Sequence, residues 1–99
     1  MCGGLLGERR LRVVRVVVPA RDFSRVAPVV SELERRAVSV KRAVKRIFDE
    51  RPDLDSVEFT IVVSLTKDEV RRYRRDLGRR LSGTIGFFLI YNHGEPSVP

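Results

Sequence analysis

The sequence predicts a small α/β domain with the order β-α-β-α-β, in which a three-stranded, mainly parallel sheet carries both helices packed on one face as a two-layer sandwich. One segment alternates with the period of a strand, and two more are short Val- or Phe-rich runs bounded by Pro or Gly. Two amphipathic helical patterns lie between them. The 99 residues suffice for one domain. We place it at residues 9–92, between a flexible N-terminal segment (1–8) and a C-terminal tail (93–99).

The first predicted strand covers residues 10–18 and ends at Pro19, which cannot donate a hydrogen bond to a sheet. Successive side chains of a strand lie on opposite faces, so the residues divide into two sets. One set contains Leu11, Val13 and Val17, and the other contains Val14, Val16 and Val18. Both faces of this strand are therefore apolar, except where Arg15 interrupts one of them.

A long helix is predicted next, from an N-cap at Asp22 or Ser24 to about Glu50. Its apolar residues follow a 3-4-3-4-3 spacing: Val30, Leu33, Ala37, Val40, Val44 and Ile47. This spacing forms one continuous stripe on a helix, which we expect to face the sheet. Pro52 ends the helix, because proline removes a hydrogen bond and clashes with the preceding turn.

The second strand is predicted at residues 57–65, where apolar and polar side chains alternate most clearly. Thr66 and Glu69 then form the pattern of a capping box, which starts a second helix that runs to about Ser82. Gly83 follows as a C-terminal cap. The buried stripe of this helix is predicted to contain Val70, Tyr73, Leu77 and Leu81.

The third strand is predicted at residues 84–92, and the short connections around the second helix suit a right-handed parallel crossover. With both helices on one side, the opposite sheet face would be open. Six apolar residues would lie on it: Val14, Val16, Val18, Val62, Phe88 and Ile90. Small monomers rarely expose such a cluster, so we expect a homodimer that buries this face. The rival is a 2-1-3 strand order with helices on both faces, which would cover these residues within one chain.

The chain has a net charge of +7, which favours acidic partners. Seven arginines lie on the outer faces of the two predicted helices: Arg35, Arg42, Arg46, Arg71, Arg72, Arg75 and Arg79. We expect the two faces to adjoin, which predicts a non-catalytic nucleic-acid-binding protein that contacts DNA or RNA phosphates with weak specificity. Four alternatives remain: a homodimeric interaction or scaffold subunit that uses the open sheet face, an acidic protein partner, a membrane surface, and an ordinary solvated helix surface.

Catalysis has little support in the residue types. The single cysteine (Cys2) and single histidine (His93) cannot build a zinc site or a catalytic triad, and no cofactor, metal site or catalytic residue is predicted. The stretch 52–60 resembles the PD-(D/E)xK nucleases, a metal-dependent family, but Thr60 occupies the lysine position. No run of 18 apolar residues predicts a membrane span, so we expect a cytoplasmic protein. The absence of Gln and Trp is typical of a thermophile-like composition.

Overall fold

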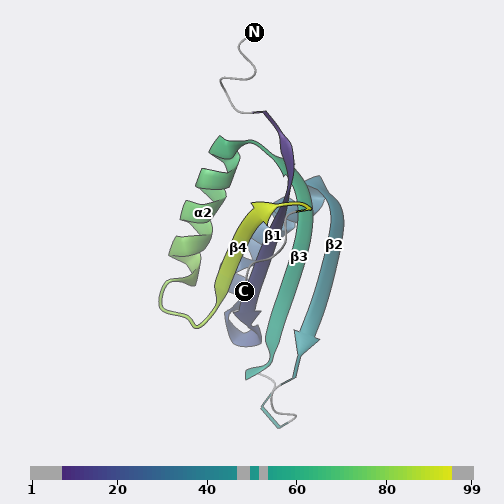
Figure 1. The fold of residues 1–99 in the computed structure, drawn as a ribbon. Helices are drawn as coiled ribbons and strands as arrows, with labels where there is room; N and C mark the ends of the chain where they lie inside the picture. The colour runs from purple at the N-terminus through teal and green to yellow at the C-terminus, as the bar shows by residue number, and fades with distance from the viewer. Residues whose placement is uncertain (1–7, 47–49, 52–53, 95–99) are drawn as a thin grey trace.

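The computed structural model describes residues 8–46, 50–51 and 54–94 (Figure 1). The elements follow the chain as β1 (Arg10–Pro19), the short 3-10 helix η2 (Ala20–Asp22), α1 (Phe23–Arg36), β2 (Ala37–Lys45), β3 (Ser56–Leu65), α2 (Lys67–Leu81) and β4 (Phe87–Asn92). Most of the predicted N-terminal segment and C-terminal tail, together with Cys2, Ile47 and Pro52, lie outside the described residues.

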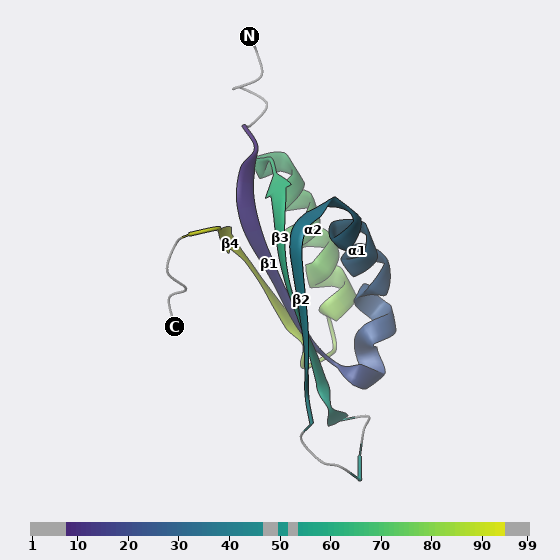
Figure 2. The same cartoon turned by 90° about the vertical axis from the view of Figure 1, so that its right-hand side faces the viewer.

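The strands form one four-stranded sheet in the order β2-β3-β1-β4, and every neighbouring pair is antiparallel. Both helices cover the same face of this sheet (Figure 2). The order β-α-β-β-α-β with this arrangement is the ferredoxin-like, or split β-α-β, fold. The predicted three-stranded, mainly parallel sheet is therefore wrong.

The error in strand count arises at residues 37–45, which were predicted as helix and form β2 instead. The helix ends at Arg36, and Ala37 already has the extended angles φ −76° and ψ 146°. Val38, Val40 and Val44 fit a strand as well as a helical stripe, and β-branched residues prefer strands. Pairing with β3 also gives backbone partners to the outer edge of that strand.

The error in strand direction has a different cause. The helix α2 does connect two strands that run the same way, as the short connections indicated. However, β1 lies between β3 and β4 and runs antiparallel to both of them. Neighbouring strands are therefore antiparallel, although β3 and β4, the two strands that α2 connects, run in the same direction.

The core lies between the sheet and the two helices. Val14, Val16 and Val18 are completely buried there, together with residues of both helices. Opposite them in the sheet, Phe59 pairs with Val16 and Ile61 with Val14. Alternation then places the other side chains of β1 on the open face.

The predicted open-face set must be corrected accordingly. Five of its six members lie on the helix-covered side: Val14, Val16, Val18, Phe88 and Ile90. The helices cover them within one chain, so they cannot form a dimer interface. Only Val62 lies on the open face, opposite Val13 in the register of β1 and β3.

The predicted start of α2 is confirmed. Thr66 accepts a hydrogen bond from the Glu69 backbone N–H, and the Glu69 side chain accepts one from the Thr66 N–H, which completes the capping box. The predicted stripe of the helix is buried in full: Val70, Tyr73, Leu77 and Leu81. Its opposite side therefore faces solvent, and this side carries the arginines.

Candidate functional site

The outer face of α2 carries four of the arginines predicted to bind phosphates: Arg71, Arg72, Arg75 and Arg79. All four are exposed. Arg71 and Arg79 make loose ion pairs of 3.7 Å, with Asp68 and Asp76 respectively. The Arg72 guanidinium lies 5.4 Å from the ring centre of Tyr73. This face is basic, but part of its charge is balanced along the same helix.

The other three predicted arginines do not extend this face. Arg35 is exposed in the last turn of α1, whereas Arg42 lies on β2 and Arg46 follows it. The guanidinium of Arg42 is bound at both ends by the Glu34 carboxylate, at 2.9 and 2.7 Å. It also lies 5.3 Å from the ring centre of Phe59. The expected joint surface of two basic helices is therefore not formed, because its premise was a helix through residues 37–46.

A groove of about 560 Å³ separates the two helices. It is lined by Glu32, Arg72, Tyr73, Arg75, Asp76, Arg79 and Arg80. The helix α1 contributes an acid to this groove rather than further cations. Arg80 is itself engaged, since it bonds Asp76 at 2.9 Å and the Arg25 carbonyl at 3.1 Å.

A polar network joins α1 to α2 at the floor of this region. The Tyr73 hydroxyl donates to Glu32 and accepts from Arg36 at 3.0 Å. Arg36 also pairs with Glu69 at 2.6 Å, and Glu69 pairs with Arg9 at 3.0 Å. These contacts fix the two helices against each other, so the network has a structural role.

The network shifts three pKa values, and the hydrogen bond to Glu69 raises that of Arg36. Burial raises the pKa of Tyr73, and its hydrogen bond to the Glu32 carboxylate raises it further. Burial by itself would raise the pKa of Glu69, but the hydrogen bonds from the Thr66 backbone and the Arg36 guanidinium outweigh it and lower that pKa. Tyr73 is therefore neutral and Glu69 ionised near pH 7.

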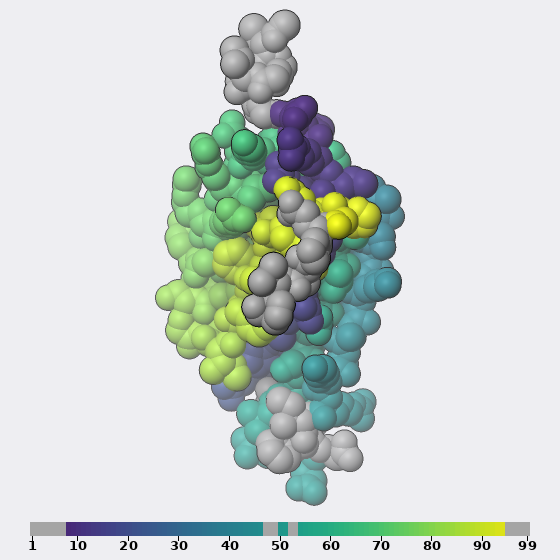
Figure 3. All heavy atoms as spheres, viewed as in Figure 1, coloured from purple at the N-terminus to yellow at the C-terminus, as the bar shows by residue number. Residues whose placement is uncertain are grey.

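The open face of the sheet is the second surface, and its two halves differ in character. The half formed by β1 and β4 carries a set of apolar side chains, which we call the β1/β4 patch: Leu11, Val13, Val17, Phe87, Leu89 and Tyr91. Apart from Val62 and Ala43, the other half carries polar side chains: Ser39, Lys41, Lys45, Glu58, Thr60 and Ser64. Figure 3 views the molecule from this side, where β4 contributes the yellow surface.

Three of the six side chains of the β1/β4 patch are exposed, Val17 and Tyr91 are half-buried, and Val13 is buried. Leu11 is 43% exposed, Phe87 51% and Leu89 44%. The sequence prediction placed Phe87 and Leu89 in the core, because both phases of β4 are apolar and alternation does not show which phase faces the helices. The charged residues of β1 did not decide the question either, because Arg15 lies opposite Leu89 on the open face while Arg12 lies on the helix-covered phase.

The described residues offer no evident metal or membrane-spanning feature. No group of three or more His, Cys, Asp or Glu among them could hold a metal ion. Asp53 of the nuclease-like stretch lies outside the described part of the chain. None of the described helices is long and apolar enough to cross a membrane.

Solved structures share this fold at low sequence identity. No protein-family model matches the chain, and no curated protein does. A putative PII-like signaling protein from Thermus thermophilus has a TM-score of 0.62 and 13% identity, covering 86% of this chain and 89% of that one. A DUF3240 family protein from Shewanella baltica has a TM-score of 0.58 and 10% identity, covering 90% and 96%.

A third structure is an enzyme, formyltetrahydrofolate deformylase from Burkholderia mallei, with a TM-score of 0.54 and 17% identity. The match covers 84% of this chain but only 28% of that enzyme, so the similarity is confined to one part of the longer enzyme. At such identities these similarities show the fold alone. They identify the chain as a small α/β domain of the ferredoxin-like type, with PII-like and DUF3240 proteins among its structural neighbours.

Proposed function

We propose that this chain is a non-catalytic signalling or scaffold subunit that self-associates through the β1/β4 patch. The observation that carries the proposal is the exposure of large apolar side chains along the open face of β1 and β4: Leu11 near one end of the pair is 43% exposed, and Leu89 and Phe87 toward the other end are 44% and 51% exposed. Isolated exposed apolar residues are ordinary, but a contiguous patch on a small domain marks an interaction site. The polar half of the same face gives the patch a defined border.

A second copy of the chain is the partner that best fits this patch. A twofold axis brings the same surface of each copy together, so an apolar patch is complementary to itself. The one charge within the patch region, Arg15, is paired with Glu58 at 2.6 Å and needs no counter-ion from a partner. At the strand edge, Arg74 donates to the Ile90 carbonyl at 3.2 Å, and a charged group there opposes strand-to-strand pairing. Packing face to face is therefore favoured over edge pairing.

The structural neighbours support the same class of function. Two of them are small proteins that match this chain over most of their length, and one is described as a putative PII-like signaling protein. Nucleic-acid binding through Arg71, Arg72, Arg75 and Arg79 is the competing proposal. It receives less support, because Arg42 is bound to Glu34 and acidic residues line the groove beside α2.

The test is the mass of wild-type protein and of two variants by sedimentation. Leu89→Asp removes an apolar contact in each copy and introduces a charge that the interface would have to bury. Leu89 is 44% exposed in the single chain, and burying this exposed part in a dimer would contribute about 1 kcal/mol per copy. Since the variant loses this contribution in both copies, we expect its association to be at least roughly tenfold weaker. Val38→Asp is the matched control, since Val38 is 71% exposed but lies on β2, away from the patch.

We expect a dimer for the wild type and for Val38→Asp, and monomer for Leu89→Asp. Equal dissociation by both variants, or none by Leu89→Asp, would contradict the assignment of the patch. A parallel titration of labelled duplex at 50 and 200 mM salt, concentrations chosen for the salt dependence of phosphate contacts, addresses the competing proposal. Tight, steeply salt-dependent binding by monomeric protein would favour nucleic acid as the partner.

A further inference from the structure

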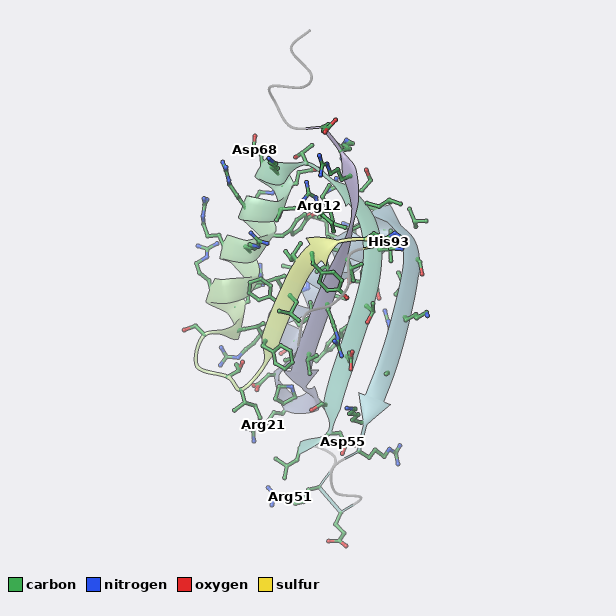
Figure 4. All side chains as sticks on the ribbon, in the orientation of Figure 1. Arg12, Arg21, Arg51, Asp55, Asp68 and His93 are labelled. Carbon is green, nitrogen blue, oxygen red and sulfur yellow. The ribbon has the colours of Figure 1, made fainter. Side chains whose placement is uncertain are left out.

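Arg12 is a buried cation, and no carboxylate of residues 8–46, 50–51 and 54–94 forms an ion pair with it. It lies on β1, its side chain points to the helix-covered side, and the residue is only 9% exposed (Figure 4). Its Nε donates to the Leu65 carbonyl at 3.2 Å and its Nη1 to the Asn92 side-chain oxygen at 3.0 Å. Both acceptors are neutral. Within the described part of the chain, the third nitrogen, Nη2, is buried and has no hydrogen-bond partner.

Burying such a group destabilises the folded state. A buried charge that lacks an opposite charge costs several kcal/mol of folding free energy, and a buried donor without an acceptor adds to this cost. Arginine does not relieve the cost by losing its proton, because its pKa is too high. An unsatisfied buried donor in a native structure calls for an explanation, and a bound ion is one of those that are known.

The surroundings of Arg12 increase the positive charge instead of balancing it. Arg12 lines a pocket of about 260 Å³ together with Lys67, Val70, Arg71 and Arg74 of α2. These four α2 residues are spaced i, i+3, i+4 and i+7, so they form one side of the helix. Among the described residues, the pocket is thus lined by four cationic side chains and no acidic one.

The nearby acids and acceptors leave this charge largely unbalanced. Asp68 pairs with Arg71 only at 3.7 Å and is 72% exposed, and Arg74 has a backbone carbonyl as its partner. Glu69 points to Arg36 and Arg9. The backbone of the first turn contributes little, since the Glu69 N–H is already bound by Thr66. Any anion in the pocket would be held by side chains.

We propose that this pocket binds a phosphate group, with Arg12 as its buried anchor. A phosphate group carries about −1.5 to −2 charges near pH 7, which matches four cations better than a single carboxylate does. The guanidinium fork of arginine suits the oxygens of such a group, and Lys67 can act as a point charge beside it. The pocket volume leaves room for a small organic substituent on the phosphate. This site is independent of the β1/β4 patch, which lies on the opposite face of the sheet.

The test is calorimetric titration with inorganic phosphate, with acetate as the carboxylate probe, at constant ionic strength. We expect saturable binding of one phosphate per chain, and acetate binding at least tenfold weaker. Arg12→Met should weaken phosphate binding at least tenfold. Arg10→Met is the matched control, because it removes the same charge from the same strand at an exposed side chain that pairs with Glu8. It should change the affinity less than twofold.

A double variant and a second phosphate ligand complete the test. The double variant Lys67→Gln, Arg74→Gln leaves the hydrogen bonds of Arg12 intact, and should weaken phosphate binding severalfold even if Arg12→Met fails to fold. Phenyl phosphate should bind as well as free phosphate if the natural ligand is a phosphomonoester, and worse if it is the free ion. Non-saturable binding, or equal loss in Arg10→Met, overturns the proposal. Leu89→Asp should retain phosphate binding, so failure of the self-association proposal would be visible separately.

Discussion

Removing the hydroxyl of Tyr73 should destabilise the protein by breaking the link between α1 and α2. Tyr73 is 3% exposed, and its hydroxyl donates to Glu32 and accepts from Arg36. A hydrogen bond to a charged group contributes about 1.5–3 kcal/mol when buried. Glu32 is exposed and the Arg36 side chain is 29% exposed, so we discount each bond by about half for solvent screening. Tyr73→Phe should then cost about 1.5–3 kcal/mol in total.

Urea unfolding followed by circular dichroism measures this change in free energy. For a domain of this size, a loss of about 2 kcal/mol corresponds to a melting temperature lower by roughly 8–16 °C. Tyr91→Phe is the control, because Tyr91 lies on the open sheet face and its hydroxyl has no partner in the described residues. If Tyr73→Phe costs no more than Tyr91→Phe, the network does not couple the helices and the reasoning fails.

Two further predictions concern the start of α2. Thr66→Ala should cost about 1 kcal/mol by removing the capping bond to the Glu69 N–H, whereas Ser24→Ala, at an exposed position of α1, should change the unfolding free energy by less than about 0.5 kcal/mol. Equal effects in urea unfolding would argue against the cap. Glu69→Gln should destabilise at pH 7, because the folded pKa of Glu69 is lowered and its stabilisation is present above the unfolded pKa of about 4.3. That stabilisation is lost as pH falls through the folded pKa, so the gap between variant and wild type should narrow below about pH 4. A gap that is constant with pH would mean that the ionised carboxylate is not the stabilising species.

Local signals in the sequence were sufficient for much of the fold. The capping box of Thr66 and Glu69 and the buried stripe of α2 could be predicted, because they depend on residues within a few positions of one another. The first strand and the strand at 56–65 also followed from residue type and alternation. These elements occupy the centre of the sheet and one of the two helices.

The predictions that were wrong concern features that depend on contacts between residues far apart in the sequence. The pattern at 37–45 satisfies both periods, and only pairing with β3 decides for a strand. The strand order places β1 between β3 and β4, which no local pattern encodes. The wrong face assignment of Val14 and Phe87 follows from the same limit, since alternation separates two faces without saying which one meets the helices.

Only part of the basic surfaces could be predicted from the sequence, because their residues also come from elements far apart in the chain. The exposed arginines of α2 could be predicted because they share one helix. Their separation from Arg42 and Arg46 follows from the strand β2, and the burial of Arg12 beside Lys67 and Arg74 follows from the packing of α2 on the sheet. Both depend on how elements far apart in the chain are brought together.

A second copy of the chain that covers the β1/β4 patch should be detectable by sedimentation equilibrium of the wild-type protein across micromolar to hundreds-of-micromolar concentrations. We expect a mass twice that of the chain at the higher concentrations, with dissociation on dilution that Leu89→Asp shifts to higher concentration. A single-chain mass throughout the range would rule out self-association through the patch.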